Sequence, residues 1–316
     1  MEALREWEPV QLAYISSPPA PGPAQPAGTN PEYGGANGLK QKYLLDGPTG
    51  ISALFAWDQP GGTGAGVQFI DIEKGWVLNH ADLLDQNGVP RVNLLSGVNL
   101  SEQAHGTNVL GILVAQDNQI GCVGIARDAI GSVVSAFRPL SGDNGVVWNI
   151  ACAIKDATNR LKPGDVILLE VQVWRDGVLA PAELEKAIFD EIELATNLGI
   201  TVIEAAANGN QHLANFVNDE QPGLHILDQA RADYADSGAI MVAPQPILTT
   251  TWPVIPAILT QIMVTGWTVM PGDGRSKQRI MILLITLAIW INIPQHLVRH
   301  PRPRPLLPVW LFWCRA

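Results

Sequence analysis

Three polar residues stand beside apolar segments, where a folded chain could use them for chemistry. Asp71 follows the apolar run GVQFI, His105 opens the segment HGTNVLGIL, and Asn208 follows the run TVIEAAA. A carboxylate, an imidazole and a side-chain amide can orient a base, transfer a proton and stabilise an oxyanion. Each residue also has a structural explanation, because Asp and Asn-Gly are common in turns and a His can cap a helix. Taken singly, they do not distinguish catalysis from structure.

The segments that carry these residues alternate between strand-like and helix-like patterns. Short apolar runs predict strands at residues 66–72, 132–137, 166–173, 201–206 and 239–242, and longer patterns predict helices at 106–115, 147–158 and 181–198. Apolar strands that take turns with helices are typical of a parallel sheet covered on both faces. We therefore predict a doubly wound, mostly parallel α/β fold, in which ligands bind at the carboxyl ends of the strands.

Together, three segments resemble the subtilisin-like serine peptidases. HGTNVLGILVAQDNQIGCVGIA is similar to the family's His-Gly-Thr helix and following loop, FIDIEKGWVLNHADL to the strand and loop with the catalytic Asp, and TVIEAAANGN to the strand that ends in the oxyanion Asn. They occur in the family's order within residues 39–244. The resemblance implies serine-type endopeptidase activity on a polypeptide substrate. It implies no organic cofactor and no catalytic metal, and leaves structural calcium open.

The resemblance also assigns roles. Asp71 would orient the imidazole of His105, His105 would be the general base, and Asn208 would donate to the oxyanion. The sequence departs from the family at Glu73, where Gly is usual, and at Ala207, where Gly usually precedes the Asn. If position 207 requires a positive φ, Ala costs about 1 kcal/mol there. The strand VILLEVQ differs from the family's commoner Ser-Leu-Gly type, so substrate preference is not transferred.

The family's Gly-Thr-Ser segment, which carries the nucleophile, is absent, and the composition changes near the same place. Residues 1–246 hold 13 of the 20 Lys+Arg and 29 of the 30 Asp+Glu, whereas the remaining residues hold one acid and five of the ten Trp. Read in a shifted frame, the codons of residues 297–304 permit Gly-Thr-Ser-Ser-Ala-Ser-Pro, with the Ser across the codons of Arg299 and His300. We therefore predict a one-base slip between about Val242 and Ile247, and an inactive chain. The alternative is a genuinely divergent tail.

This interpretation divides the chain into three parts. Residues 1–38 form a Pro/Gly-rich arm or linker, residues 39–246 an incomplete subtilisin-like domain, and residues 247–316 a non-native tail. The apolar run at residues 280–293 is shorter than the roughly 20 residues that cross a bilayer, so no membrane association is expected. The N-terminal sequence MEALREWEP has no apolar segment of the kind that secretory signals carry. The compartment and the oligomeric state stay open.

Other functions have less support. A non-catalytic protein could keep the peptide groove without turnover. A metal hydrolase could use Asp71, Glu73, His80 and Asp82, but their spacing does not match a metal site, and a solvated acidic loop with a structural hydrogen bond at His80 is the simpler interpretation. The glycines of GGTGAG precede a predicted strand, whereas a dinucleotide fingerprint follows one. The formal net charge of −10 argues against nucleic acid, and three scattered Cys indicate neither a zinc site nor a disulfide framework.

Overall fold

The computed structural model describes residues 41–44, 51–100, 103–118, 121–140, 145–209, 213–217, 224–228 and 230–242. The predicted arm at residues 1–38 and the predicted tail at residues 247–316 lie outside these ranges, so both remain predictions. None of the described helices is both long and apolar enough to cross a bilayer.

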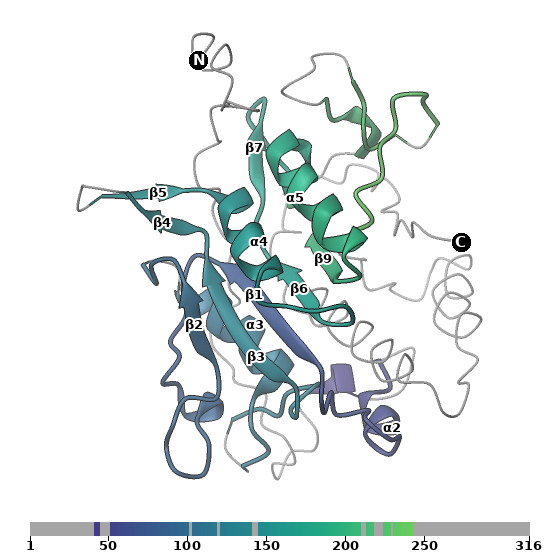
Figure 1. Cartoon of the computed structure of the whole chain (residues 1–316). Coiled ribbons are helices and arrows are strands. Elements are labelled where there is room, and N and C mark those ends of the chain that lie inside the picture. The colour runs from purple at the N-terminus through teal and green to yellow at the C-terminus, as the bar shows by residue number, and fades with distance from the viewer. Residues whose placement is uncertain are drawn as a thin grey trace, which may run out of the picture.

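A six-stranded sheet forms the centre of the described chain, and all of its neighbouring strands run parallel (Figure 1). The strand order is β10-β9-β6-β1-β3-β2, so the chain starts near the middle, builds one side and then builds the other. This order confirms the predicted doubly wound, mostly parallel fold. The strands are β1 (Gln68–Glu73), β2 (Asn93–Ser96), β3 (Ile130–Ser135), β6 (Val166–Leu169), β9 (Thr201–Ala205) and β10 (Ile240–Val242).

Helices cover the two faces of this sheet (Figure 1). Side chains alternate along a strand, so β1 sends Phe69 toward the helix α3 (Gln103–Val114) and Ile70 toward α4 (Ile150–Thr158) and α5 (Lys186–Asn197). Burial on both faces explains why the strands are almost wholly apolar. The shorter helical elements are η1 (Lys42–Leu44), α2 (Ala53–Trp57), η2 (Ala81–Leu83), η3 (Ala182–Leu184) and η4 (Leu213–Asn215).

Several predicted elements were too long, because short hairpins follow the strands. The predicted strand at 166–173 ends with β6, and β7 (Val173–Arg175) then pairs antiparallel with β8 (Val178–Ala180). Asp176 and Gly177 both have positive φ between these strands. An Asp-Gly pair between apolar runs predicts such a two-residue turn, and this signal was overlooked. Likewise, the predicted helix at 147–158 begins only at α4, since β5 (Val146–Trp148) pairs with β4 (Phe137–Pro139), and the predicted helix at 181–198 divides into η3 and α5.

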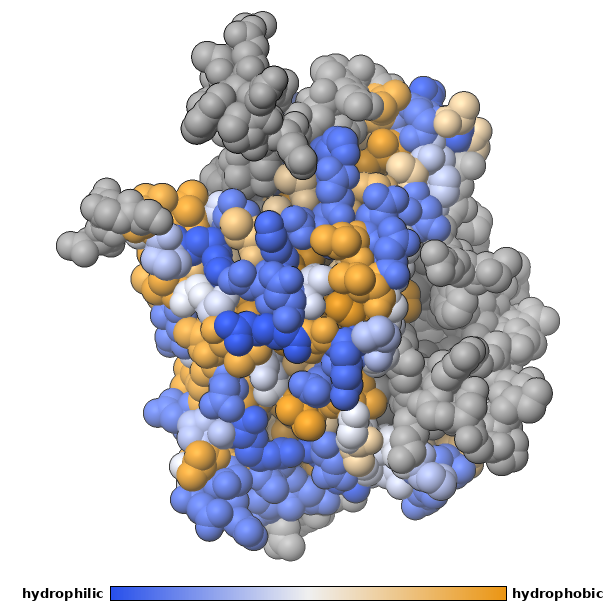
Figure 2. Space-filling model, in the orientation of Figure 1, coloured by the Kyte–Doolittle hydropathy of each residue, from blue (hydrophilic) through white to orange (hydrophobic). Residues whose placement is uncertain are grey.

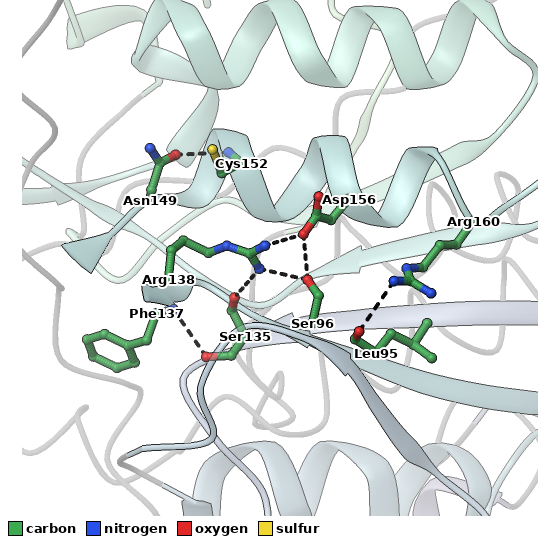
Figure 3. Close-up of polar contacts among 9 residues, drawn as sticks. All are labelled: Leu95, Ser96, Ser135, Phe137, Arg138, Asn149, Cys152, Asp156 and Arg160. Atoms are coloured by element: carbon green, nitrogen blue, oxygen red, sulfur yellow. Dashed lines mark hydrogen bonds and ion pairs between the residues drawn. The ribbon is translucent and has the colours of Figure 1, made fainter. Parts of the chain in front are cut away.

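The β4–β5 hairpin projects from the sheet and is tied to it at its base (Figure 1). The Arg138 guanidinium donates to Ser96 Oγ at 2.8 Å and to the Ser135 carbonyl oxygen at 3.1 Å, and it pairs with the carboxylate of Asp156 on α4 (Figure 3). One cation therefore joins β2, the end of β3 and α4. Farther out, Val146 and Val147 are exposed. Figure 2 shows orange, hydrophobic residues on the side of the molecule where this hairpin projects in Figure 1.

Two carboxyl groups are buried on the α5 side of the sheet. The Glu183 N–H in η3 donates to Glu204 Oε1 at 3.0 Å, and Ser237 Oγ donates to Glu183 Oε2. Burial raises the pKa of Glu183 to about 7. Burial, together with the charge of Glu183, raises the pKa of Glu204 well above its ordinary value of 4.5. The folded protein therefore holds protons here that the unfolded chain releases.

Replacing Glu204 with Gln is expected to weaken the pH dependence of stability. Because the folded-state pKa of both acids is raised, their stabilisation is fully present below the unfolded pKa of 4.5. It is lost as pH rises through their folded-state pKa values, and the value for Glu183 is about 7. Gln keeps the acceptor for Glu183 but cannot ionise. Between pH 5 and pH 8, the Tm of E204Q should fall less than that of the wild type, by about 3 °C or more, equivalent to about 1 kcal/mol.

The matched control is Glu193→Gln, because Glu193 is exposed on α5. Thermal unfolding followed by circular dichroism at both pH values gives the comparison. E193Q should keep the wild-type pH dependence. If E204Q and E193Q lose equal stability between pH 5 and pH 8, the buried pair does not contribute as described.

Candidate active site

Ionisable side chains gather at the carboxyl edge of the sheet. Asp71 and Glu73 lie near the end of β1, Glu170 directly follows the neighbouring strand β6, and His105 lies in the first turn of α3. Asp71 and Glu73 are two and four residues after Phe69, so strand alternation sends them to the α3 side. These residues lie at the end of β1. The strands β3 and β2 lie on one side of β1, and the later strands β6, β9 and β10 lie on its other side, so the order of the strands reverses here. Doubly wound sheets bind ligands at such a position.

His105 is buried, with 5% of its surface exposed. Its Nδ1 hydrogen-bonds the carboxylate of Glu73, and its Nε2 has no hydrogen-bond partner among the described residues. Burial disfavours the charged imidazole, but the carboxyl groups of Glu73, Glu170 and Asp71 outweigh burial and raise the pKa of His105 to about 9. One nitrogen is thus bound to an acid, while the other is buried and makes no hydrogen bond within the described part of the chain.

Asp71 has a different partner. Its Oδ2 accepts a hydrogen bond from the Trp76 indole N–H at 2.7 Å, and its Oδ1 has no partner within the described part of the chain. The carboxyl is fully buried. Burial, followed by the charge of Glu73, raises the pKa of Asp71 well above its ordinary value. The structure therefore brings both sequence-predicted residues, Asp71 and His105, into one cluster, but the hydrogen bond to His105 comes from Glu73.

Glu170 is a third acid in this cluster, and the sequence analysis did not identify it as a site residue. Burial raises its pKa to about 8, opposed by the charge of His105. Glu170 belongs to the segment VILLEVQ, which was predicted as a strand and not as part of a site. An acid in a run that is otherwise apolar could have revealed it, since buried acids cluster at functional sites.

The His-Gly-Thr segment docks the β1–η2 loop on α3. A Cβ at Gly106 would lie 2.5 Å from the Gly75 carbonyl oxygen and 2.6 Å from the Trp76 indole nitrogen, so only glycine fits. The next residue, Thr107, accepts a hydrogen bond at Oγ1 from the Val77 N–H at 2.8 Å. These contacts fix the loop that follows Glu73 against the first turn of α3, where His105 lies.

Asn208 follows β9 and is held by Gln172. Both the backbone N–H and Nδ2 of Asn208 donate to Gln172 Oε1, at 2.9 Å and 3.2 Å. Ala207, the preceding residue, has φ of 67°, so the condition under which Ala carries a steric cost at this position is met. Gln172 was not predicted as a site residue, although it lies in the segment VILLEVQ, which departs from the family pattern.

The four residues of the metal-hydrolase alternative do not form a solvated loop, and this expectation was wrong. Asp71, Glu73 and Asp82 are all buried. Asp82 accepts a hydrogen bond from the Cys122 N–H at 3.2 Å, and His80 Nδ1 accepts one from the Asp82 N–H at 3.3 Å, which confirms a structural role for His80. Within the described ranges, no group of three or more His, Cys, Asp or Glu residues is arranged to hold a metal ion.

Replacing Ala207 with Gly is expected to stabilise the protein by about 1 kcal/mol, because glycine adopts a positive φ without the steric cost of a Cβ. Chemical denaturation of the full chain measures this change. The control is Ala205→Gly in β9, which should destabilise by about 0.5 to 1 kcal/mol because glycine weakens a strand. A destabilisation by A207G equal to that by A205G would show that the left-handed conformation costs nothing here.

Known proteins similar to this chain are serine proteases by name. No protein-family model matches. The chain is 28% identical over 218 residues to subtilisin BL of Lederbergia lenta, covering 65% of this chain and 74% of the relative. It is 36% identical over 203 residues to the Aeromonas extracellular serine protease of Aeromonas sobria, covering 57% of this chain and 32% of the relative. The match thus spans about a third of the Aeromonas protein.

Among solved structures, the Clostridium perfringens CspB protease is 18% identical, with a TM-score of 0.38 over 53% of this chain and 42% of the other. The superposition is partial. The sequence matches show that this chain is similar to subtilisin-type serine proteases, in agreement with the resemblance carried by the three sequence segments.

Proposed function

We propose that this chain derives from a serine-type endopeptidase in which His105 is the general base, and that in its present form it lacks the nucleophile. One observation carries the proposal. The imidazole of His105 is bound to a carboxylate through Nδ1, while Nε2 has no hydrogen-bond partner among the described residues. A Ser hydroxyl would give its proton to that nitrogen as it attacks a peptide carbonyl.

The other proposed roles follow from position at the same edge. The Asn208 side-chain amide would donate to the oxyanion of the tetrahedral intermediate, a contribution of about 3 to 4 kcal/mol known from subtilisin itself. The polypeptide substrate would add as a strand beside the sheet, with main-chain hydrogen bonds supplying affinity. No organic cofactor or catalytic metal takes part in this chemistry. The Ser itself would come from the shifted frame across the codons of Arg299 and His300.

A second candidate is a non-catalytic protein that keeps a peptide-binding groove beside the same sheet. The geometry of Asn208 favours it, because the Nδ2 that would serve the oxyanion donates to Gln172. The same turn holds Ala207 in a left-handed conformation, which carries a steric cost for a residue with a Cβ. This candidate differs from the first in one measurable property: it binds peptides without cleaving them.

Sequencing the gene and the transcript across the codons of residues 235–316 tests the frame directly. One extra or missing base supports the peptidase origin. An intact frame leaves the peptidase as an ancestor and favours the groove-binding protein.

Repairing the frame is expected to create activity. The chain with its tail translated in the Gly-Thr-Ser frame should cleave a casein substrate and react with a fluorophosphonate probe for active serines. The chain as given should do neither, since without a nucleophile only residual catalysis remains. His105→Ala in the repaired chain should lower kcat by at least about 10⁴-fold.

The control for the repaired chain is His80→Ala, which removes a structural histidine outside the acid cluster and should leave most activity. Labelling of the chain as given would overturn the assignment of the nucleophile to the shifted frame. A folded repaired chain that binds peptides but cleaves none would favour the second candidate.

A further inference from the structure

Two acids of β1 lie near the imidazole of His105, and they differ in the side chain to which each is hydrogen-bonded. Asp71 and Glu73 lie two residues apart on the same face of the strand. Both are buried near His105, yet only Glu73 makes a hydrogen bond to it. The Asp71 carboxylate is engaged with the Trp76 indole instead.

We propose that Glu73, and not Asp71, is the carboxylate that orients the imidazole of His105, and that Asp71 holds the Trp76 indole against α3. Both acids are thus positioning residues, acting on different partners. The inference deepens the proposed function and rests on it for what the oriented base would act upon. The contacts themselves do not depend on that function.

The surroundings of Trp76 fix the partner of Asp71. The Asn99 side chain holds the backbone of Trp76 from both sides, accepting from its N–H at 2.9 Å and donating to its carbonyl oxygen at 2.8 Å. The indole lies against Gly106, where no side chain fits. Trp76 is almost completely buried, with 1% of its surface exposed. Its N–H must therefore find a buried acceptor, and Asp71 is that acceptor.

Charge favours the same division. The acids that face His105 are Glu73 from β1, Glu170 from the end of β6 and Asp71 from β1. Burial raises the pKa of Glu170 to about 8 and raises that of Asp71 well above its ordinary value. Among the acids that raise the pKa of His105, Glu73 acts most strongly, through both its charge and its hydrogen bond, followed by the charge of Glu170 and then that of Asp71. Glu73 is also the acid whose carboxylate hydrogen-bonds Nδ1 of His105.

Histidine-selective NMR of the full chain tests the proposal without any need for activity. The signal of His105 is assigned by its loss in His105→Gln, and its pKa is followed to pH 10.5. In Glu73→Gln the pKa of His105 should fall by about two units, because the contact and the charge are both lost. In Asp71→Asn it should change by less than about half a unit.

The Trp76 indole N–H signal, assigned by its loss in Trp76→Phe, gives the reciprocal readout. It should shift in Asp71→Asn, which removes the carboxylate that accepts from it, and stay in place in Glu73→Gln. Glu73→Asp keeps the charge but shortens the reach, so it should lower the pKa of His105 by about one unit. This variant serves if Glu73→Gln fails to fold.

A larger fall in the pKa of His105 in Asp71→Asn than in either Glu73 variant would overturn the proposal. So would a pKa that neither Glu73 variant changes. These outcomes are separate from those of the proposed function. A repaired chain that cleaves nothing, combined with a His105 pKa that depends on Glu73, would reject the peptidase while keeping the division of roles.

Discussion

Side chains on a β-strand point alternately to the two faces of a sheet, and the candidate active site depends on how β1 uses this period. Phe69, Asp71 and Glu73 point toward α3, while Ile70 and Ile72 enter the opposite core with α4 and α5. A shift of one residue would bury two acids among the apolar side chains of α4 and move two isoleucines into the site. The parallel pairing of β1 with both β3 and β6 prevents that shift.

Burial then determines the behaviour of the acids that this register brings together. Three carboxyl groups surround one imidazole in a region that water barely reaches. Three ionised carboxylates would repel one another strongly because they are buried away from water. Some of them therefore keep their protons. What distinguishes the acids is therefore their contacts. Glu73 has the imidazole and Asp71 has the indole, while Glu170 Oε1 has no hydrogen-bond partner among the described residues.

Periodicity was sufficient to predict the parallel sheet and its covering helices, whereas the family resemblance implied that Asp71 and His105 lie in one cluster. The sequence alone did not predict which acid of β1 contacts His105, because that depends on the length and direction of each side chain. Two acids on one strand face look equivalent in a sequence, and only the docking of Trp76 on Gly106 shows which one meets His105. The β7–β8 hairpin was missed because only three residues separate β6 from β7 in the sequence, although the two strands belong to different sheets.

The acids on the two faces of the sheet share a thermodynamic consequence. Glu183 and Glu204 on one face, and Asp71, Glu170 and His105 on the other, all hold protons to a higher pH when folded than their ordinary values allow. Folding near neutral pH therefore takes up protons from the buffer. The heat of folding measured by calorimetry must then include the ionisation heat of the buffer, so phosphate and Tris will report different enthalpies for the same structural change.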